Sequence, residues 1–508
     1  MILINGQMCC IFWRCRMYIS HIELENFKSF KGHNSIPFSS GVNYLVGNNN
    51  AGKTTVFQAI DFLVNGGKKE DYINLDCSDQ EVSVTVFVSQ VGELQGTLKK
   101  YDSYRDEQDQ MIFQRSSKEG TISQGKKTVK MDIKTVRMWN PSPENGEPKF
   151  ENPSGAPSTV KALFSPQFVY ADSHNEDFRD FGSTKITGKL IASLASDFYE
   201  DPVYKDFLTA HQKAFGKDGV KKYLTNVEDD LSQLLDNQFG ESKVQFVFDA
   251  PAAPDMLKKG NIKILENGLL TDASEKGNGM QRALALAIIQ VVAERTGRKG
   301  NDDKIRGMQF FVDEPEIYLH PLAQDRLMES LANLTPENQV FITTHSPYIL
   351  RHFRKTTDSV NILSVQGDKR VRPMEKLNFK SPTIAEVTYK AFGVPTPELH
   401  SQLFSFLYMD WIGNHNGNGR FKDFNNYLGK DCNLDDDYHD FYARYNGGAF
   451  SKVPQDVTTP YAVRNMIDHP ELCENGKNVL NESILKKGID DLIAAISYIQ
   501  VKSSNKAE

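Results

Sequence analysis

The chain has 508 residues, of which 39% are hydrophobic and 25% are charged. This is the composition of an ordinary soluble globular protein, and the length predicts about three domains. The net charge of −7 argues against a dedicated nucleic-acid-binding protein, which carries a basic domain or stripe. The six cysteines include no Cys-x2-Cys pair, so the sequence supports neither a zinc site nor a disulfide framework.

The first 16 residues, MILINGQMCCIFWRCR, are apolar, and their charges follow the apolar run instead of preceding it. That order is wrong for a signal peptide. We therefore expect residues 1–16 to be a disordered extension, with folding beginning near Met17. No run approaches the roughly 18–20 apolar residues that cross a membrane, so a cytoplasmic protein without a membrane partner is expected.

The folded chain is predicted to open with short strands. Residues 18–46 alternate apolar and polar residues in the runs YISHIEL and VNYLV, separated by a turn at 31–34. VNYLV leads directly into GNNNAGKTT, and TTVFQAIDFLV then has apolar residues at helical spacing. A strand, a loop and a helix are thus expected in succession.

The loop between that strand and helix matches G-x4-G-K-[ST] in every required position. Gly47 permits a tight turn, and Gly52 lets backbone N–H groups approach a phosphate at the start of a helix. Lys53 is predicted to reach the β- and γ-phosphates of a nucleotide, and Thr54 to ligate Mg2+. The predicted nucleotide contacts of this Walker A loop are Gly47, Asn48, Asn49, Asn50, Ala51, Gly52, Lys53, Thr54 and Thr55.

The next part of the chain predicts strands and a helical pair. VSVTVFVSQ (82–90) and TLKKYDSY (97–104) are strand-like, and residues 102–160 are predicted to form a hairpin with a long loop. Residues 190–216 and 219–240 have the apolar spacing of two amphipathic helices.

Strand-like runs return at KVQFVFDA (243–250) and IKILENG (262–268), and strands then alternate with helices over 265–365. From about residue 380 helical segments dominate, separated by polar stretches such as GNHNGNG. The overall fold class expected is α/β followed by a mostly helical C-terminal domain.

A second glycine-containing loop enters a predicted helix at SEKGNGMQRALALAII (274–289). Its N–H groups and helix dipole predict a second anion site. One chain needs one triphosphate cradle per nucleotide, so this loop makes sense if it serves ATP held by another copy. The predicted contacts are Gly277, Asn278, Gly279 and Gln281.

Two apolar strands end in polar residues further along the chain. MQFFVDE ends in Asp313, which is predicted to hold Mg2+ through water, and Glu314, which is predicted to deprotonate the attacking water. In VFITTHSP the apolar strand is followed by His345. This histidine comes after the Walker A and Walker B motifs, where a sensor of the γ-phosphate is expected.

In this order the motifs resemble the SMC-like branch of the ABC ATPases, which includes RecF and the OLD family. The segment IELENFKSFKGHNSIPFSSGVNYLVGNNNAGKTT resembles that branch's first strands and P-loop, and GNGMQ occupies the place of the ABC signature, with Asn278 where serine usually stands. DEPEIYLHP and TTHSP match the OLD-like subgroup. The resemblance implies an ABC-type head, ATP and Mg2+ as cofactors, contacts from Lys28 and Ser29 to the nucleotide, and a slow ATPase. A Q-loop glutamine is left open between Gln90 and Gln167.

Two departures from those families shape the functional prediction. The insertion between the Walker A and signature motifs is a short helical hairpin instead of long coiled-coil arms. A Toprim nuclease domain would need an apolar strand before its Asp-x-Asp, and Asp435-x-Asp437 lies in a polar stretch. What remains resembles the ATPase subunits of the antiphage systems Septu and PARIS. That resemblance implies a homodimer or larger homo-oligomer, a separately encoded nuclease effector, and a nucleic acid or phage protein as trigger.

The C-terminal region contains Arg464-Asn465-x3-His469, which resembles the signature of HEPN ribonucleases. There the arginine steadies a phosphate and the histidine exchanges a proton. Pro470 predicts that the helix ends at His469. A structural or partner-docking role of Arg464 and His469 is the alternative to an RNase site.

The sequence therefore predicts five segments: an extension (1–16), a first ATPase lobe (17–185), a helical hairpin insertion (186–245), a second ATPase lobe (246–375) and a helical C-terminal domain (376–508). The predicted function is an ATPase subunit that scaffolds and regulates a nuclease in antiphage defence. A self-contained HEPN-like RNase and a RecF-like DNA repair ATPase are the alternatives.

Overall fold

The computed structural model describes residues 17–92, 96–124, 127–143, 147–164, 166–169, 201–251, 262–281, 309–317, 319–354, 356–366, 368–373, 383–414, 419–435, 455–470 and 479–504, with a few shorter pieces between them. The predicted extension 1–16 lies outside these residues. Contacts divide the chain into two compact units, Met1–Leu45, Gly52–Thr344 and Thr357–Ser359 in the first, and Val46–Ala51, His345–Thr356 and Val360–Glu508 in the second.

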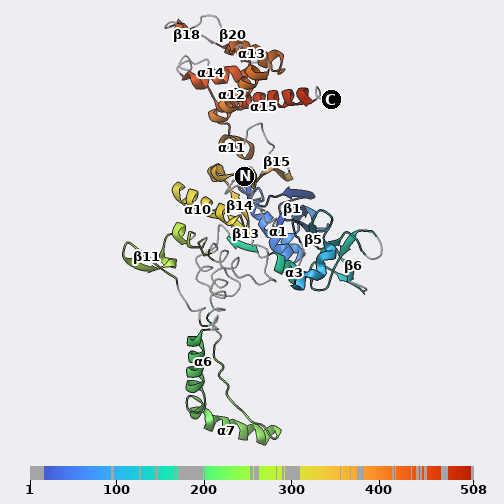
Figure 1. Cartoon of the computed structure of the whole chain (residues 1–508), viewed down its shortest axis with the longest axis vertical. Coiled ribbons are helices and arrows are strands. Elements are labelled where there is room, and N and C mark those ends of the chain that lie inside the picture. The colour runs from blue at the N-terminus through green and yellow to red at the C-terminus, as the bar shows by residue number, and fades with distance from the viewer. Residues whose placement is uncertain are drawn as a thin grey trace, which may run out of the picture. The chain divides into compact units, whose positions relative to one another are not determined.

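The first unit contains an antiparallel sheet in the order β2-β1-β4-β5-β8-β9 (Figure 1). Its strands are β1 Tyr18–Glu25, β2 His33–Pro37, β4 Ser83–Ser89, β5 Gln110–Ser116, β8 Val136–Asn140 and β9 Lys149–Glu151. Apolar residues of β1 and β4 such as Ile22, Leu24, Val84 and Val86 are fully buried. Their alternation with more exposed residues is the period of a strand with one covered face. The predicted strands at 18–46 and 82–90 are confirmed.

Residues 97–104 are not the predicted strand; they lie in η2, a 3-10 helix at Gly96–Tyr104. The reason is the three-residue spacing of two tyrosines, which places them on one side of a 3-10 helix. Tyr101 Oη donates to Ser154 O at 2.7 Å, and Tyr104 Oη to Glu151 Oε2 at 3.1 Å. These long-range contacts outweigh the local strand propensity of the segment.

The prediction of one hairpin over 102–160 was also wrong. That range contains β5, β8 and β9 of the sheet, the hairpin β6 Gly120–Gln124 with β7 Lys127–Met131, and helix α3 Ala156–Leu163. Short strands separated by Gly, Lys and Ser residues have too little alternation each to be recognised singly.

The second sheet supplies the first unit with strands in the order β10-β13-β14-β3, of which β10, β13 and β14 pair in parallel. They span Pro166–Val169, Gln309–Asp313, Gln339–Thr344 and Val42–Gly47. Every residue of β3, β13 and β14 is buried, which explains why these strands read as continuous apolar runs. The ring of Phe311 stacks on that of Phe341 with 4.5 Å between the ring centres. It also contacts the ring of Phe57 on helix α1 edge to face, with 5.1 Å between the centres.

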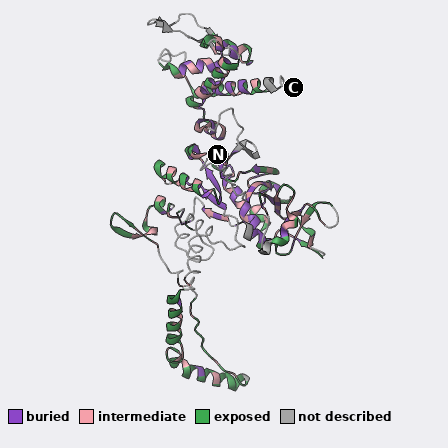
Figure 2. Ribbon diagram, viewed as in Figure 1, coloured by how far each residue is buried: buried purple, intermediate pink, exposed green. Residues whose placement is uncertain are grey.

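Helices of the first unit flank these strands. The first of them, α1 Lys53–Asn65, confirms the predicted helix, and α10 Pro321–Leu334 packs against β14. The described part of this unit also contains the short elements α2 Lys69–Tyr72, η1 Leu75–Cys77 and η3 Ala273–Glu275. Figure 2 shows buried residues on the sheets and α1, in contrast to the largely exposed pair α6 and α7.

The helical insertion contains α6 Pro202–Phe215 and α7 Lys221–Phe239. These helices confirm the described part of the predicted pair, while residues 190–197 lie outside it. The strand predicted at 243–250 is wrong in this structure, because these residues have no strand partner among the described parts of the chain. A hairpin of β11 Lys263–Glu266 and β12 Leu269–Asp272 follows.

The second unit has an antiparallel pair, β15 Ser359–Gln366 with β16 Asp368–Pro373, and the 3-10 helix η4 Pro347–His352. Its helices are α11 Ile384–Phe392, α12 Pro397–Asn414, α13 Phe421–Lys430, α14 Thr459–Asp468 and α15 Glu482–Ser504. Small strand pairs join β17 Tyr438–Phe441 to β20 Gln455–Val457 and β18 Tyr445–Asn446 to β19 Ala449–Phe450.

A core of Leu403, Phe424, Ile489, Leu492 and their neighbours joins α12, α13, α14 and α15. The predicted helical character of the C-terminal region is confirmed. None of the helices in the described residues is long and apolar enough to cross a membrane.

Candidate nucleotide site

The Walker A loop begins with a glycine that cannot be replaced without displacing backbone. A Cβ on Gly47 would lie 2.3 Å from Leu363 O. The turn that follows is closed by Ala51 N–H, which donates to Asn48 O at 3.2 Å, and Asn50 takes a φ of 61°. The sequence GNNNA thus supplies residues that tolerate a tight, partly left-handed turn.

Gly52 is the N-cap of helix α1 and has a φ of 96°. A Cβ there would approach Ser29 Oγ to 2.6 Å and the ring of Phe30 to 3.1 Å. Helix α1 has no side-chain N-cap and no acidic residue in its first turn. The positive end of this helix is therefore suited to an anion such as a phosphate.

Lys53 is 5% exposed, and its Nζ lies 3.8 Å from Glu314 Oε1. Burial lowers the pKa of Lys53 from its ordinary value, and the neighbouring carboxylates, Glu314 first, oppose this effect. Because charges interact more strongly where water is largely excluded, the buried ammonium group of Lys53 can interact strongly with a phosphate that enters the site.

Asp313 ends β13 and is held by hydroxyl groups from two other elements. Thr54 Oγ1 on α1 donates to both of its oxygens at 3.2 Å, and Thr343 Oγ1 on β14 donates to Oδ1. Parallel pairing of β13 and β14 places Asp313 opposite Thr343. The two predicted Mg2+ ligands, Thr54 and Asp313, are thus brought together.

Glu314 follows with a φ of 47°, in the left-handed region. Its N–H donates to both Thr343 O and Thr343 Oγ1 at 3.0 Å. Such a conformation costs about 1–3 kcal/mol in a residue with a Cβ, and it persists where surrounding contacts enforce it. Here those contacts turn the carboxylate toward Lys53.

The sequence alone did not single out four residues of the candidate site, which are Thr343, Thr344, Glu316 and Asn26. Thr344 Oγ1 donates to Glu316 Oε1 at 2.6 Å, so the two threonines of β14 hold two different carboxylates. The sequence does contain a sign of this role in TTHSP. There two hydroxyl residues end a buried strand, which pairs with the strand that leads into DEPE.

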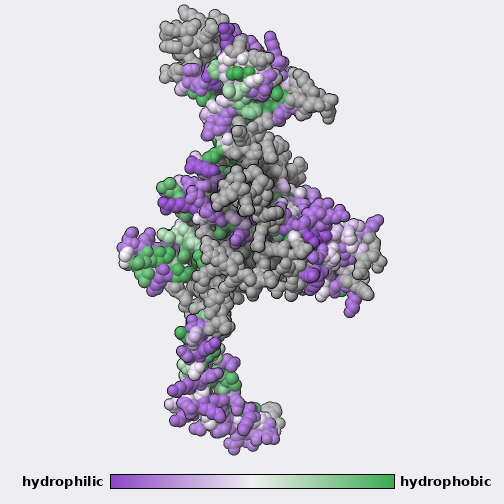
Figure 3. All heavy atoms as spheres, viewed as in Figure 1, coloured by the Kyte–Doolittle hydropathy of each residue, from purple (hydrophilic) through white to green (hydrophobic). Residues whose placement is uncertain are grey.

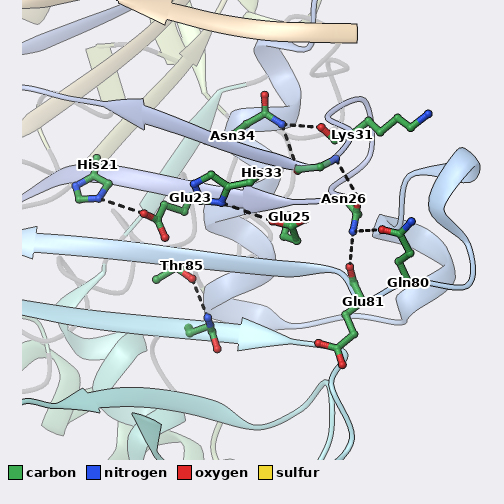
Figure 4. A network of polar contacts seen from close by, with 12 residues as sticks. His21, Glu23, Glu25, Asn26, Lys31, His33, Asn34, Gln80, Glu81 and Thr85 are labelled. Atoms are coloured by element: carbon green, nitrogen blue, oxygen red, sulfur yellow. Dashed lines mark hydrogen bonds and ion pairs between the residues drawn. The ribbon is translucent and has the colours of Figure 1, made fainter. Parts of the chain in front are cut away.

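Asn26 fixes the loop that carries Lys28 and Ser29 (Figure 4). Its Nδ2 donates to Gln80 Oε1 and Glu81 O, and its Oδ1 accepts from Gly32 N–H at 3.0 Å. It is 3% exposed and has a φ of 49°. A buried asparagine with its amide satisfied in this way specifies one loop conformation.

Lys28 and Ser29 lie on this loop. Ser29 Oγ is 3.1 Å from Thr55 Oγ1 on α1, so it contacts the Walker A helix directly. Lys28 has its Nζ 5.2 Å from the centre of the Tyr72 ring, and its N–H donates to Tyr72 O at 2.6 Å.

The predicted signature loop leads into a helix at Asn278. Gly277 and Asn278 are exposed, and a Cβ on Gly277 would meet nothing within 4 Å. Gln281 is 6% exposed, and its Nε2 donates to Ser274 O at 3.0 Å and Lys276 O at 2.5 Å. The amide predicted to contact nucleotide therefore shapes the loop from within, while Gly277 and Asn278 face solvent.

For three other predicted residues, His345, Gln167 and Gln90, the structure gives their place relative to the strands. His345 directly follows β14 and so comes next after Thr344 in the chain. Gln167 is 4% exposed within β10, and Gln90 follows β4 with a φ of 57°. Neither observation assigns a Q-loop.

The chemistry of these residues fits ATP with Mg2+. A hydroxyl and a carboxylate, Thr54 and Asp313, are the oxygen donors that Mg2+ prefers, and it keeps several waters besides. Lys53 and the uncapped N-terminus of α1 suit phosphates. Glu314 is the carboxylate beside them that can accept a proton.

The sequence matches the family of the AAA ATPase domain over residues 17–152 and 167–350. The chain belongs to this family. It is an ATPase of the SMC-like and OLD-like kind, with an ABC-type α/β head.

Two curated relatives are OLD nucleases. The chain is 25% identical to the Old nuclease of Escherichia phage P2 over 416 residues, 75% of this chain and 64% of the relative. It is 22% identical to the OLD nuclease of Thermus scotoductus over 378 residues, 68% of this chain and 64% of that relative. The chain thus spans less than two thirds of the length of either relative.

Local matches also exist. A 56-residue segment is 43% identical to the DNA replication and repair protein RecF of Tropheryma whipplei, covering 11% of this chain and 15% of that protein. Among solved structures, the SMC head bound to the C-winged helix domain of ScpA covers 70% of this chain and 98% of its own, with 16% identity and a TM-score of 0.38.

The Arg464 and His469 pair lies in the second unit. Helix α14 ends at Asp468, as predicted, with His469 as its C-cap. Arg464 Nη2 lies 2.7 Å from Asp468 Oδ2, Nη1 donates to Asn465 Oδ1 at 3.1 Å, and the guanidinium stacks 4.1 Å from the Phe421 ring centre. These contacts give Arg464 a packing role between α13 and α14.

Proposed function

We propose that this chain is the ATP-binding and ATP-hydrolysing subunit of a bacterial antiphage complex, in which it scaffolds and regulates a separate nuclease. The observation that carries the ATPase part is the convergence of Lys53, Thr54, Asp313 and Glu314 at the ends of α1 and β13. The defence part rests on the similarity to OLD nucleases and on the resemblance of the sequence to the ATPase subunits of antiphage systems.

In the proposed reaction Glu314 accepts a proton from water as the water oxygen attacks the γ-phosphorus and the bond to the β-phosphate oxygen breaks. Lys53 and the N-terminus of α1 stabilise the charge on the phosphate oxygens. Thr54 and Asp313 would hold Mg2+, which neutralises part of that charge. The Thr343 hydroxyl donates to the Asp313 carboxylate and accepts from the Glu314 backbone N–H, so it holds both acidic residues in position.

The signature loop is proposed to complete this site in a second copy. Gly277 and Asn278 are exposed at the start of a helix, so their end of the helix is accessible to a nucleotide that another chain holds. An ATP-dependent homodimer, or a larger assembly of such pairs, follows from this arrangement. ATP binding would then change the surface that the nuclease partner contacts.

The self-contained RNase is the weaker alternative. The contacts of Arg464 with Asp468, Asn465 and Phe421 already explain its place in the fold. The RecF-like alternative is supported by a match over 11% of the chain, which is short compared with the match to the OLD nucleases.

A co-expression experiment tests the proposal. The full chain is expressed in bacteria alone, with the products of its neighbouring genes, and as Lys53→Ala with the same products. Phage plating should fall only when chain and neighbours are both present, and Lys53→Ala should abolish that protection together with ATP hydrolysis. Protection by the chain alone would contradict a scaffold role, and full protection by Lys53→Ala would contradict the part played by ATP.

A further inference from the structure

A tight turn between β1 and β2 lies against the start of helix α1. Phe30 N–H donates to Phe27 O at 2.8 Å, and the side chains of both residues are fully buried. Lys28 and Ser29 occupy the two positions between them. Ser29 Oγ would be 2.6 Å from a Cβ on Gly52, the N-cap of α1. The turn therefore contacts the end of α1 that is suited to a phosphate.

The backbone of this turn is strained at a lysine. Lys28 has a φ of 47° at the second position of the turn. Glycine normally takes a positive φ at this position, because a Cβ is crowded there. Strain of this kind persists only where surrounding contacts enforce it, and it concentrates at functional sites. A lysine in this place therefore points to a use of its side chain.

The ammonium group of Lys28 lies over an aromatic ring and not beside an acid. Its Nζ is 5.2 Å from the centre of the Tyr72 ring, and none of the ion pairs in the described chain involves this lysine. The Tyr72 ring is itself fixed, with its centre 5.5 Å from that of Phe27 and 4.7 Å from that of Phe62. A cation held on a ring in this way remains available to an anion.

The segment that follows α1 holds the backbone of the strained lysine. Lys28 N–H donates to Tyr72 O at 2.6 Å, and Lys28 O accepts from Asn74 Nδ2 at 2.6 Å. Asn74 N–H donates to Asn26 O at 2.7 Å, and Asn74 Oδ1 accepts from Asp76 N–H at 3.0 Å. The amide of Asn74 is thus fixed through both its oxygen and its nitrogen. Both backbone groups of Lys28 are held from outside the turn.

We propose that Asn74 is a positioning residue for ATP binding and that it acts through Lys28. Its amide keeps the lysine backbone in the left-handed conformation, which keeps the ammonium group beside the bound nucleotide. This role rests on the assignment of the ATP site to the Walker A loop. The carboxylic residues of the site, Asp313 and Glu314, are held by Thr343. Loss of the Asn74 amide therefore weakens ATP binding and leaves the hydrolytic step unchanged.

Steady-state ATPase kinetics of the full chain test this role. Asn74→Ser keeps an oxygen that can accept from Asp76 N–H, but its side chain is too short to reach Lys28 O. The KM for ATP should rise about 10-fold, as for one lost hydrogen bond, with kcat within about twofold of wild type. The matched control is Asn34→Ser, because Asn34 Nδ2 donates to Lys31 O at 3.1 Å near the same turn. This control should keep both constants. An unchanged KM in Asn74→Ser, or an equal rise in both variants, would overturn the proposal.

A double variant separates this role from a purely structural one. Lys28→Gly takes the left-handed conformation without support and has no ammonium group. It should raise KM by itself, and adding Asn74→Ser should then raise KM less than about twofold further, because the two changes remove the same interaction. Effects on KM that multiply in the double variant would show that Asn74 does not act through Lys28.

Two controls complete the experiment. Thermal unfolding followed by circular dichroism should give Asn74→Ser and Asn34→Ser similar midpoints, and a fall in kcat at constant KM in Asn74→Ser would indicate a structural role alone. Lys53→Ala tests the site itself. If Lys53→Ala retains turnover, the assignment of the ATP site fails. If Lys53→Ala is inactive while Asn74→Ser leaves KM unchanged, only the positioning role fails.

Discussion

At the scale of single residues, Thr343 connects the parts of the candidate site. Its hydroxyl donates to Asp313 and accepts from Glu314 N–H, so one side chain determines the position of both acidic residues. The sequence identified the carboxylates from the end of a buried strand, but it could not identify Thr343. That role depends on the parallel register of β13 and β14, which local periodicity does not contain.

The first prediction concerns this hydroxyl. Thr343→Val should raise the Mg2+ concentration needed for half-maximal ATPase activity about 10- to 100-fold, the usual effect of losing a residue that orients a metal ligand. Thr343→Ser keeps the hydroxyl and should remain close to wild type. Titrating ATPase activity with Mg2+ measures both variants. An unchanged Mg2+ dependence of Thr343→Val would show that Thr54 alone is enough to position Asp313.

The second prediction separates binding from hydrolysis. Glu314→Gln removes the proposed base but leaves Asp313 and its hydroxyl partners in place, so ATP should remain bound while hydrolysis falls by about 100-fold or more. With ATP, size-exclusion chromatography should then show an assembly at least as large as that of wild type. Unchanged turnover would assign the base to another residue.

At the scale of elements, the long and strongly patterned segments were predictable and the short ones were not. The strand–loop–helix around Walker A and the buried strands β13 and β14 followed from their apolar runs. The segment 97–104 became η2 because Tyr101 and Tyr104 reach Ser154 and Glu151, about 50 residues away in sequence. Residues 243–249 have strand propensity, but Val244 N–H and Phe246 N–H donate to side chains of α7. Within the described chain the segment therefore pairs with no other strand.

The apolar hairpin before the signature loop shows a similar limit. Leu265, Leu269 and Leu270 are 69%, 65% and 57% exposed, and Figure 3 shows hydrophobic residues gathered at this hairpin. Alternation predicted a strand there, but it could not predict which face would be covered. Burial depends on partners in space, which the sequence pattern alone does not supply.

The third prediction tests how α1 is attached to the antiparallel sheet. Arg115 on β5 is 4% exposed and donates to Leu63 O near the end of α1 and to Ile133 O and Lys134 O. Arg115→Met leaves these carbonyl groups without a charged donor and should cost about 2–4 kcal/mol of stability. Arg105→Met, at a surface ion pair with Asp109, should cost about 0–1 kcal/mol. Thermal inactivation of the ATPase measures the two variants, and equal midpoints would contradict a structural role for Arg115.

At the scale of the whole molecule, the ATP site and the signature loop are proposed to act between chains. The fourth prediction follows from that geometry. Lys53→Ala and Gly279→Asp should each be inactive alone, because one lacks the phosphate ligand and the other places a negative charge in the signature loop. Mixed, they should regain up to one working site per pair. Mass spectrometry of the intact assembly verifies mixing, and no recovery in a verified mixed assembly would argue against the sandwich.

The last prediction concerns whether this chain is its own effector. An HEPN-type site uses the 2′-hydroxyl of RNA as nucleophile, so it would cleave RNA without added metal and leave DNA intact. Arg464 is instead paired with Asp468 and stacked on Phe421, and the chain has a net charge of −7, which gives RNA little electrostatic attraction. We therefore expect the purified full chain to leave RNA intact in the presence of a chelator, with or without ATP. RNA cleavage that is lost in His469→Ala, while ATP hydrolysis continues, would overturn the scaffold proposal and establish the C-terminal helices as the effector.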